Sequence, residues 1–396
     1  MTGAQKRAVL LLAIGQTMTY SGVYYSFPAI LPDLEAATGW SKATLAMGPT
    51  ISFLLMALLA PFTGRLVDRG LGGEMLAFLP VPAALAIALM GFAASPFWWL
   101  VLWALVGVAQ AGCLYETCFA FLTRRLGDSA RAAIVRVTLV AGFAGTLSFP
   151  LGHWLAAAFG ASGALIGFAC LMIFVGVPAN LIGARILRAN TVLAGAERSA
   201  APHGMVRISL AKPAFWGIAA ILGLTYLNHG ILITYVLELF GSRGASAGMV
   251  TLAAATIGPC QVLGRFLLML NEARVGNRRA TYLSLAGLLT GAAALWLAGV
   301  APAAIFLTAA CQGAGIGIMS IMRPVLIAEH LGREGFGAVS GVIAISPILA
   351  SAAGPLVGAW LLTAGGPGLV IGVCAGLALL AMGVWAAIKP AAVRQG

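Results

Sequence analysis

The chain is built from long apolar runs joined by short polar connections. A helix of about 20 apolar residues crosses the roughly 30 Å of hydrocarbon in a bilayer, and each run reaches that length. The runs are continuously hydrophobic rather than alternating, which indicates helices and excludes a closed β-barrel. The twelve predicted spans lie near residues 8–30, 43–63, 75–95, 97–123, 131–158, 162–186, 213–240, 246–270, 277–299, 302–328, 334–363 and 367–388.

The composition agrees with an all-α membrane protein. Of 396 residues, 61% are hydrophobic and only 9% are charged, whereas a soluble domain carries about 25% charged residues. Lys and Arg (23) outnumber Asp and Glu (11), but they form no basic patch or tail, which argues against nucleic-acid binding. The sequence contains no metal-ligand cluster, nucleophile motif or phosphate-binding loop, so we expect no cofactor, no metal and no enzymatic activity.

The basic residues also orient the predicted helices. With the twelve spans placed as above, nearly all of the basic residues fall on one side of the membrane, and only Lys42 and Arg243 fall clearly on the other. Cytoplasmic segments carry the excess of Lys and Arg, so both termini are expected in the cytoplasm and the protein in the cytoplasmic (inner) membrane. The predicted organisation is an N-terminal six-helix half (1–186), a cytoplasmic linker (187–212) and a C-terminal six-helix half (213–396).

The two predicted halves repeat each other in sequence. Residues 110–155 align with residues 315–361 when Gln110 is laid on Gly315, an offset of 205 residues, and Leu126 then matches Leu331. Six-plus-six repeats of this kind place the substrate site between the halves, near the middle of the membrane.

A short motif follows the second predicted span. Residues 64–70 read G-R-L-V-D-R-G, which resembles the G-x-L-x-D-R signature of the major facilitator superfamily. The resemblance covers essentially the whole chain and implies a transporter with a cytoplasmic gate, to which Gly64 and Arg65 belong. It also implies that Asp68 accepts the gate contact and that Arg69 or Arg131 is its partner. The family signature usually ends in further basic residues, where this chain has G-G-E.

A narrower resemblance points to the monocarboxylate and oxalate/formate branches of that family. It rests on Gly39-Trp40-Ser41, on Tyr24-Tyr25 and on the stretch 332–355. These branches move small organic anions and often carry a basic residue in the eighth or eleventh helix. This chain departs from them, because its eighth helix offers Gln261 with Thr256 and Cys260, and its eleventh helix has no Lys.

Two charged residues lie inside predicted spans, Glu116 in the fourth and Arg323 in the tenth. A charge facing lipid is costly, so each is expected to face a cavity or a partner. Arg323 is a candidate anion site and Glu116 a candidate proton carrier. Two other interpretations stay open: an inner gate in which the two charges pair, and charges fixed within their own halves. Pro324 disfavours a regular helix after Arg323, and irregular backbone usually lines a cavity.

Other polar residues in the spans complete the candidate site. His229 can titrate near neutral pH and is a candidate proton carrier, although a satisfied packing histidine is an alternative. Tyr20, Tyr24, Tyr25 and Asn228 are candidate substrate contacts, with interfacial anchoring as the alternative for Tyr24 and Tyr25. Gln261 is a further candidate, with a hydrogen bond between helices as its alternative.

The sequence therefore predicts a monomeric, proton-coupled secondary transporter whose partners are protons, lipid and a small organic anion such as a monocarboxylate. The alternative is a proton-driven exporter of amphipathic compounds or drugs.

Overall fold

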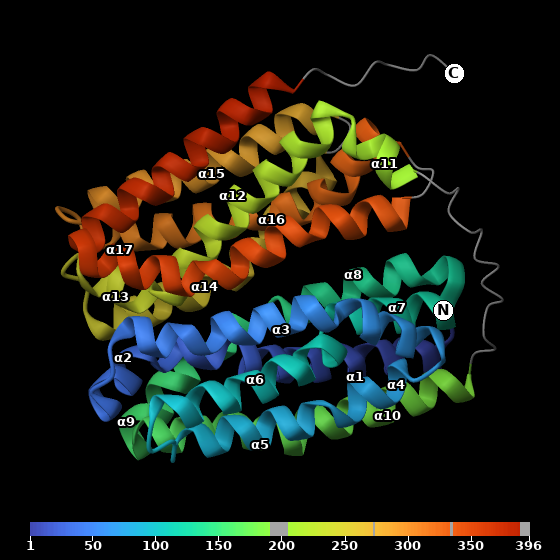
Figure 1. Cartoon of the computed structure of the whole chain (residues 1–396), viewed down its shortest axis with the longest axis horizontal. Coiled ribbons are helices and arrows are strands. Elements are labelled where there is room, and N and C mark those ends of the chain that lie inside the picture. The colour runs from blue at the N-terminus through green and yellow to red at the C-terminus, as the bar shows by residue number, and fades with distance from the viewer. Residues whose placement is uncertain (191–204, 272–273, 333–335, 389–396) are drawn as a thin grey trace. The chain divides into compact units, whose positions relative to one another are not determined.

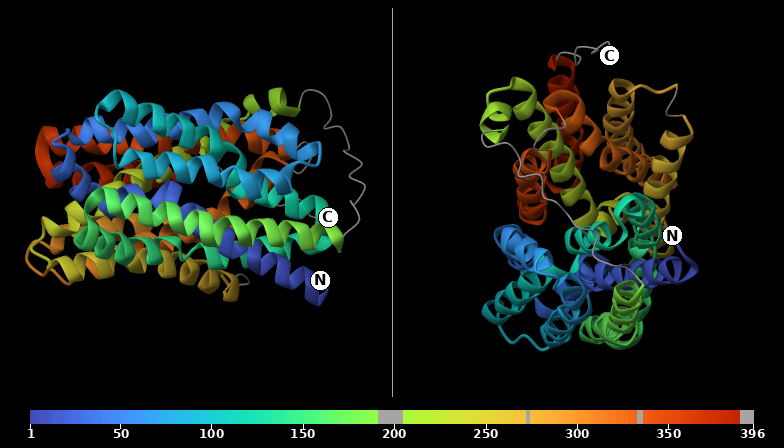
Figure 2. Two further views of the ribbon diagram at one scale, coloured as in Figure 1. Left: turned by 90° about the horizontal axis from the view of Figure 1, so that it is seen from below. Right: turned by 90° about the vertical axis from the view of Figure 1, so that its right-hand side faces the viewer.

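The computed structural model describes residues 1–190, 205–271, 274–332 and 336–388. The side chains of a few helical residues, including Asp68 and Arg131, lie outside this description, as does most of the predicted linker. Within the described ranges the chain is helical and contains no strand, which confirms the all-α prediction. The chain divides into two compact units, Met1–Glu197 and Arg198–Gly396. In each unit the helices run side by side as a bundle (Figures 1 and 2).

The first unit begins with a nearly continuous helical run over residues 3–38. Its elements are α1 (Gly3–Tyr20), a π-helical turn η1 (Ser21–Tyr25), α2 (Ser26–Thr38), α3 (Lys42–Asp68), α4 (Gly72–Phe78), α5 (Pro80–Met90), α6 (Pro96–Cys113), α7 (Tyr115–Leu126), a 3₁₀ turn η2 (Gly127–Ser129), α8 (Ala130–Ala141), α9 (Ala144–Leu171), a π-helical turn η3 (Met172–Gly176) and α10 (Val177–Ala189).

The second unit has fewer interruptions. Its elements are α11 (Met205–Leu210), α12 (Pro213–Thr234), α13 (Val236–Gly241), α14 (Ala247–Leu270), α15 (Asn277–Leu297), α16 (Ala304–Leu331) and α17 (Phe336–Ala387). Basic side chains satisfy carbonyl groups at two helix ends, as is favourable where a helix dipole is negative. Lys212 Nζ donates to the Leu331 carbonyl at 3.3 Å, and Arg278 donates to the Ile388 carbonyl at 2.9 Å.

Nine apolar helices in the described part of the chain are long enough to cross a membrane. Two of these, Ala132–Ala189 and Val339–Ala387, each contain a break and so correspond to two predicted spans. The breaks fall at Gly160 (φ 70°) and Gly366 (φ 65°), in a backbone conformation that favours glycine. The residues 3–38 make up the first span. The predicted twelve-span arrangement is therefore confirmed.

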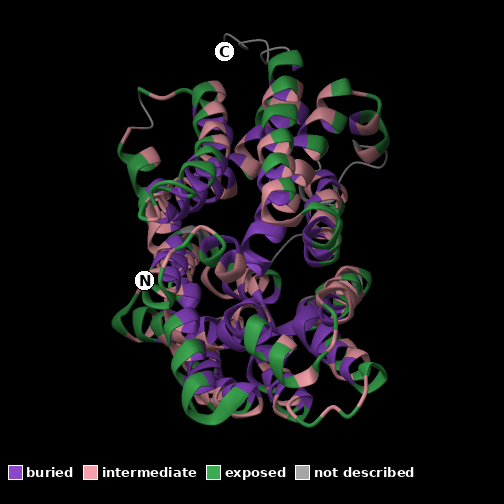
Figure 3. Cartoon of the chain, turned by 90° about the vertical axis from the view of Figure 1, so that its left-hand side faces the viewer, coloured by how far each residue is buried: buried purple, intermediate pink, exposed green. Residues whose placement is uncertain are grey.

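Both units pack their helices through small residues. In the first unit a Cβ added at Gly183 would lie 3.0 Å from the Ala8 carbonyl oxygen, so α10 lies against the backbone of α1. In the second unit a Cβ at Gly264 would lie 2.7 Å from Ala314 Cα, so α14 and α16 are equally close. Small residues are what allow such approaches in membranes. Within each unit, buried residues gather between helices and exposed residues lie on the outer turns (Figure 3).

Gly291 is a buried helical glycine with room for a methyl group. A Cβ at Gly291, in the middle of α15, would meet its nearest atom at 3.4 Å, an ordinary contact. Gly291→Ala is expected to raise the free energy of unfolding by about 0.5–1 kcal/mol, because alanine favours the helix. Gly264→Ala is the contrasting variant, since its Cβ would force α14 away from α16. Thermal unfolding in detergent checks both; equal losses in the two variants would contradict these helix contacts.

Candidate functional site

The fourth span is broken in the middle. Helix α6 ends at Cys113, Leu114 is extended (φ −96°, ψ −164°), and α7 begins at Tyr115. The break lies within a continuous apolar stretch, Pro96–Leu126, and is therefore at membrane depth. Irregular backbone is tolerated there only when protein atoms satisfy it or when it lines a cavity.

Helix α1 supplies the atoms that hold this break. Gln16 is fully buried, and its Nε2 donates to the Cys113 carbonyl at 2.9 Å. One turn later along α1, the ring of Tyr20 lies 4.4 Å from that of Tyr115. The end of α6 and the start of α7 are thus each tied to α1 by a side chain.

Glu116 lies in the first turn of α7, directly after the break. Its side chain is exposed within the unit, and no residue in the described ranges makes an ion pair or hydrogen bond with its carboxylate. It is close enough to Tyr20 to interact with it electrostatically. A carboxylate at this end of a helix is stabilised by the positive end of the helix dipole.

The three candidate tyrosines belong to one aromatic cluster. The ring of Tyr20 lies 6.3 Å from that of Tyr24, and Tyr24 lies 4.8 Å from Tyr25. Tyr115 extends the cluster and stacks on Phe119 at 4.9 Å. The first unit therefore brings together three predicted substrate contacts and Glu116, with the addition of Tyr115 and Phe119.

A π-helical turn displays two of these tyrosines. Residues Ser21–Tyr25 form η1, and Pro28 follows three residues later. Proline has no N–H, so it cannot bond the Tyr24 carbonyl four residues earlier, and the helix relaxes locally. Such π turns are frequent at functional sites.

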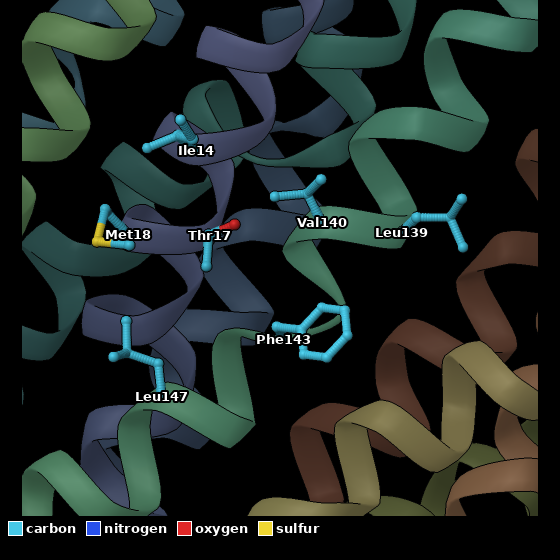
Figure 4. A pocket seen from close by; sticks show the side chains of 7 residues that line it. All are labelled: Ile14, Thr17, Met18, Leu139, Val140, Phe143 and Leu147. Carbon is cyan, nitrogen blue, oxygen red and sulfur yellow. The ribbon is translucent and has the colours of Figure 1, made fainter.

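The first unit also has an apolar groove. It has a volume of about 440 Å³ and lies between α1 and the stretch from α8 to α9 (Figure 4). Its lining residues are Ile14, Thr17, Met18, Leu139, Val140, Phe143 and Leu147. The Thr17 hydroxyl donates to its own helix, to the Ala13 carbonyl, so the groove offers mostly apolar surface.

In the second unit Asn228 and Gln312 bridge three helices. Asn228 Nδ2 donates to the Cys374 carbonyl at 2.8 Å, and Gln312 Nε2 donates to Asn228 Oδ1 at 3.0 Å. Asn228 is only 1% exposed. The structure thus places this predicted substrate contact in a buried network between α12, α16 and α17.

His229 is buried beside that network on α12. Its Nδ1 and the Thr225 hydroxyl, one turn earlier, have no hydrogen-bond partner in the described part of the chain. Gln261, the candidate on α14, is also buried, and its backbone contacts Gly317 of α16. The side chains of His229, Thr225 and Gln261 therefore lie inside the bundle of the second unit.

Arg323 lies on α16, eight residues before its end at Leu331, or roughly 12 Å along the helix. Its side chain is half-buried, and no carboxylate in the described ranges pairs with it. The expectation of irregular backbone here is wrong, because α16 continues through Pro324 from Ala304 to Leu331. A long membrane helix tolerates a proline although the proline donates no backbone hydrogen bond.

The predicted gate residues lie near the end of α3. Gly64 and Arg65 are in the helix and Arg69 follows it, and all three residues are exposed. The side chains of Asp68 and Arg131 lie outside the described residues, so the predicted gate contact stays a prediction.

Comparison with known proteins identifies the family. No curated protein matches the chain. The family model described as Major Facilitator Superfamily matches residues 12–346. The chain belongs to this superfamily. Membership confirms the expectation drawn from the 64–70 motif, although the resemblance to the monocarboxylate and oxalate/formate branches is not confirmed.

Solved structures of facilitators share the fold. A bacterial homologue of the human lysosomal transporter Spinster, in an inward-facing and occupied conformation, has a TM-score of 0.71 at 16% identity, covering 98% of this chain and 96% of its own. The nucleoside transporter NupG has a TM-score of 0.67 at 13% identity, covering 98% of both chains. These likenesses show a shared fold, and membership of the superfamily indicates a multi-pass membrane transporter rather than an enzyme.

The G-G-E stretch that departs from the family signature takes part in an ion pair, through Glu74. Glu74 forms a two-pronged ion pair with Arg188 of α10, and Arg188 Nη2 also donates to the Gly70 carbonyl at 3.1 Å. A Cβ at Gly73 would lie 3.0 Å from the guanidinium, so glycine leaves room for it. The G-G-E sequence thus holds α10 against the signature turn, a contact that the sequence alone did not suggest.

A double-mutant cycle tests this ion pair. Glu74→Gln and Arg188→Gln are each expected to lower the free energy of unfolding. Their coupling should be only about 0.5–1 kcal/mol, because both side chains are partly exposed to solvent. Thermal unfolding of the two single variants and the double variant gives this coupling; strict additivity would contradict the pair.

Proposed function

We propose that this facilitator is a proton-coupled carrier of a small organic anion such as a monocarboxylate. It works in the cytoplasmic membrane, with both termini in the cytoplasm, and its two halves alternate in giving access to the site. Arg323 binds the anion, Glu116 carries the proton, and His229 is a second candidate for the proton.

The main support for this proposal is that Arg323 is half-buried in its helix without a carboxylate partner among the described residues. Arg323 lies about 12 Å along the helix from the end of α16. A cation at this depth is costly unless an anion compensates it, and guanidinium binds carboxylates with two parallel hydrogen bonds. A small carboxylate supplies that anion.

The surroundings of Glu116 support its role as proton carrier. Its carboxylate is accessible within its unit and has no fixed cation among the described residues, so it can gain and lose a proton without breaking an ion pair. It also lies beside a helix break and the tyrosine cluster, where a change in its charge affects the candidate site directly.

The test is uptake of labelled small carboxylates by proteoliposomes, with and without an inward proton gradient. At least one member of the panel is expected to accumulate only when the gradient is present. If no carboxylate shows gradient-dependent uptake, the proposal is overturned.

A second candidate function is export of amphipathic compounds. The apolar groove between α1 and the α8–α9 stretch favours it, as does the aromatic cluster, because both suit a flat apolar cargo. Proteoliposomes that expel an amphipathic dye in response to a proton gradient, and that show no carboxylate uptake, would establish this candidate instead.

A further inference from the structure

Beside the break between α6 and α7, helix α1 buries a side-chain oxygen atom that no donor among the described residues reaches. Gln16 is fully buried, and its Oε1 has no hydrogen-bond partner in the described part of the chain. The Nε2 of the same carboxamide is 2.9 Å from the Cys113 carbonyl oxygen. The two heteroatoms of a carboxamide are about 2.3 Å apart, so Oε1 lies within roughly 5 Å of that carbonyl. Buried acceptors in proteins nearly always have a partner, so this one points to a ligand.

More oxygen atoms surround the same point. The last turn of a helix has carbonyl groups without intrahelical partners, which carry partial negative charge. Helix α6 ends this way at Cys113, and Leu114 makes no backbone hydrogen bond back to it. Glu116 adds a carboxylate from the first turn of α7, three residues beyond Cys113. The break is therefore flanked by a buried side-chain amide oxygen, by backbone carbonyl oxygens at the end of α6 and, three residues along the chain, by the exposed side chain of Glu116.

This donor set identifies the class of ligand. Oxygen donors alone suit hard cations, whereas thiolate or imidazole would favour a transition metal. Carbonyl groups at interrupted membrane helices are suited to sodium ions in particular. A single carboxylate neutralises a monovalent cation, and a divalent ion would leave an uncompensated charge at membrane depth.

We propose that the α6–α7 break is a sodium site formed by Gln16 Oε1, carbonyl oxygens at the end of α6 and the Glu116 carboxylate. The inference rests on the proposed function in one respect, namely that Glu116 takes part in coupling. A sodium ion at the break would supply the counter-charge of the Glu116 carboxylate.

The test is thermal unfolding of the purified full-length protein in detergent, without substrate, in NaCl, KCl or choline chloride at equal ionic strength. Sodium is expected to raise the unfolding temperature saturably, by roughly 2–4 °C, by binding the folded state. Potassium and choline should not. Gln16→Met should raise the sodium concentration for half of the effect at least about tenfold, because one ligand is lost.

Gln110→Met is the matched control. Gln110 is also buried, but both ends of its carboxamide are bonded: its Nε2 donates to the Val23 carbonyl at 2.9 Å, and its Oε1 accepts from the Ser52 hydroxyl at 2.7 Å. Whatever stability this variant loses, it should keep the sodium response of the native chain.

Glu116→Gln provides a test that does not depend on a folded Gln16 variant. The side chain of Glu116 is exposed within its unit, and loss of its carboxylate should remove the sodium response. Equal stabilisation by potassium or choline, or an unchanged sodium response in Glu116→Gln, would overturn the site. Proton-driven carboxylate uptake without a sodium response overturns only this inference. A sodium response without any carboxylate uptake overturns only the proposed function.

Discussion

Arg323→Ala is expected to abolish saturable carboxylate uptake by proteoliposomes at ordinary substrate concentrations. The guanidinium is half-buried on α16 and has no carboxylate partner among the described residues, so the substrate would supply its counter-charge. A hydrogen bond to a charged group contributes about 1.5–3 kcal/mol, which corresponds to a loss of affinity of roughly 10- to 100-fold. Initial uptake rates over a range of substrate concentrations give this value.

Two further variants separate binding from folding. Arg323→Lys keeps the charge but not the two-pronged geometry, so uptake should weaken without disappearing. Arg279→Ala is the matched control, because Arg279 is an exposed arginine in the first turn of α15. Unchanged affinity in Arg323→Ala would exclude Arg323 from the binding site and favour a gating or structural role.

Glu116→Gln is expected to lose gradient-driven accumulation while retaining exchange of labelled for unlabelled substrate. Glutamine preserves the size and hydrogen-bonding capacity of the side chain but cannot carry a proton. Net transport requires the proton to be loaded and released, whereas exchange needs only the anion site. Accumulation should fall to the level of protein-free liposomes, and counterflow into preloaded vesicles should continue.

The control for this charge is Glu35→Gln. Glu35 lies on α2, outside the predicted first span, and pairs with Lys42 at 3.2 Å. Its replacement should leave accumulation intact. Full accumulation in Glu116→Gln would remove Glu116 from the coupling step and make His229 the first residue to examine.

The fold could be predicted from the sequence because the bilayer imposes simple requirements. A segment in hydrocarbon must satisfy its own backbone, so continuous apolar runs are helices, and their number and order follow directly. The 64–70 motif then identified the family. The two longest helical stretches also agree with the predicted spans, since their breaks at Gly160 and Gly366 fall where short connections were expected.

The irregular membrane helix, however, was predicted to be the tenth span, whereas the structure has the break in the fourth. Pro324 favoured a disturbed backbone in the tenth span, but α16 is continuous there. The break occurs at Leu114, in a stretch without proline. Gln16, 97 residues earlier in the chain, binds the Cys113 carbonyl at this point. A contact between residues so distant in sequence leaves no local pattern by which it could be predicted.

The partners of the polar residues were hidden for the same reason. Asn228 is an apparent substrate contact when its span is considered alone, yet its amide is bonded to Gln312 and to the Cys374 carbonyl. Glu74 is an apparent departure from the family signature until Arg188 is placed beside it. In both cases the residue type was informative, but its role depended on which helix packs against it.

The most direct test of proton-coupled anion transport follows both species in the same vesicles. Proteoliposomes containing a pH-sensitive dye are given labelled carboxylate, and protein-free liposomes correct for passive entry. We expect the lumen to acidify in proportion to the carboxylate taken up, and neither signal to appear with Arg323→Ala. Protein-dependent carboxylate uptake without acidification of the lumen would contradict proton coupling.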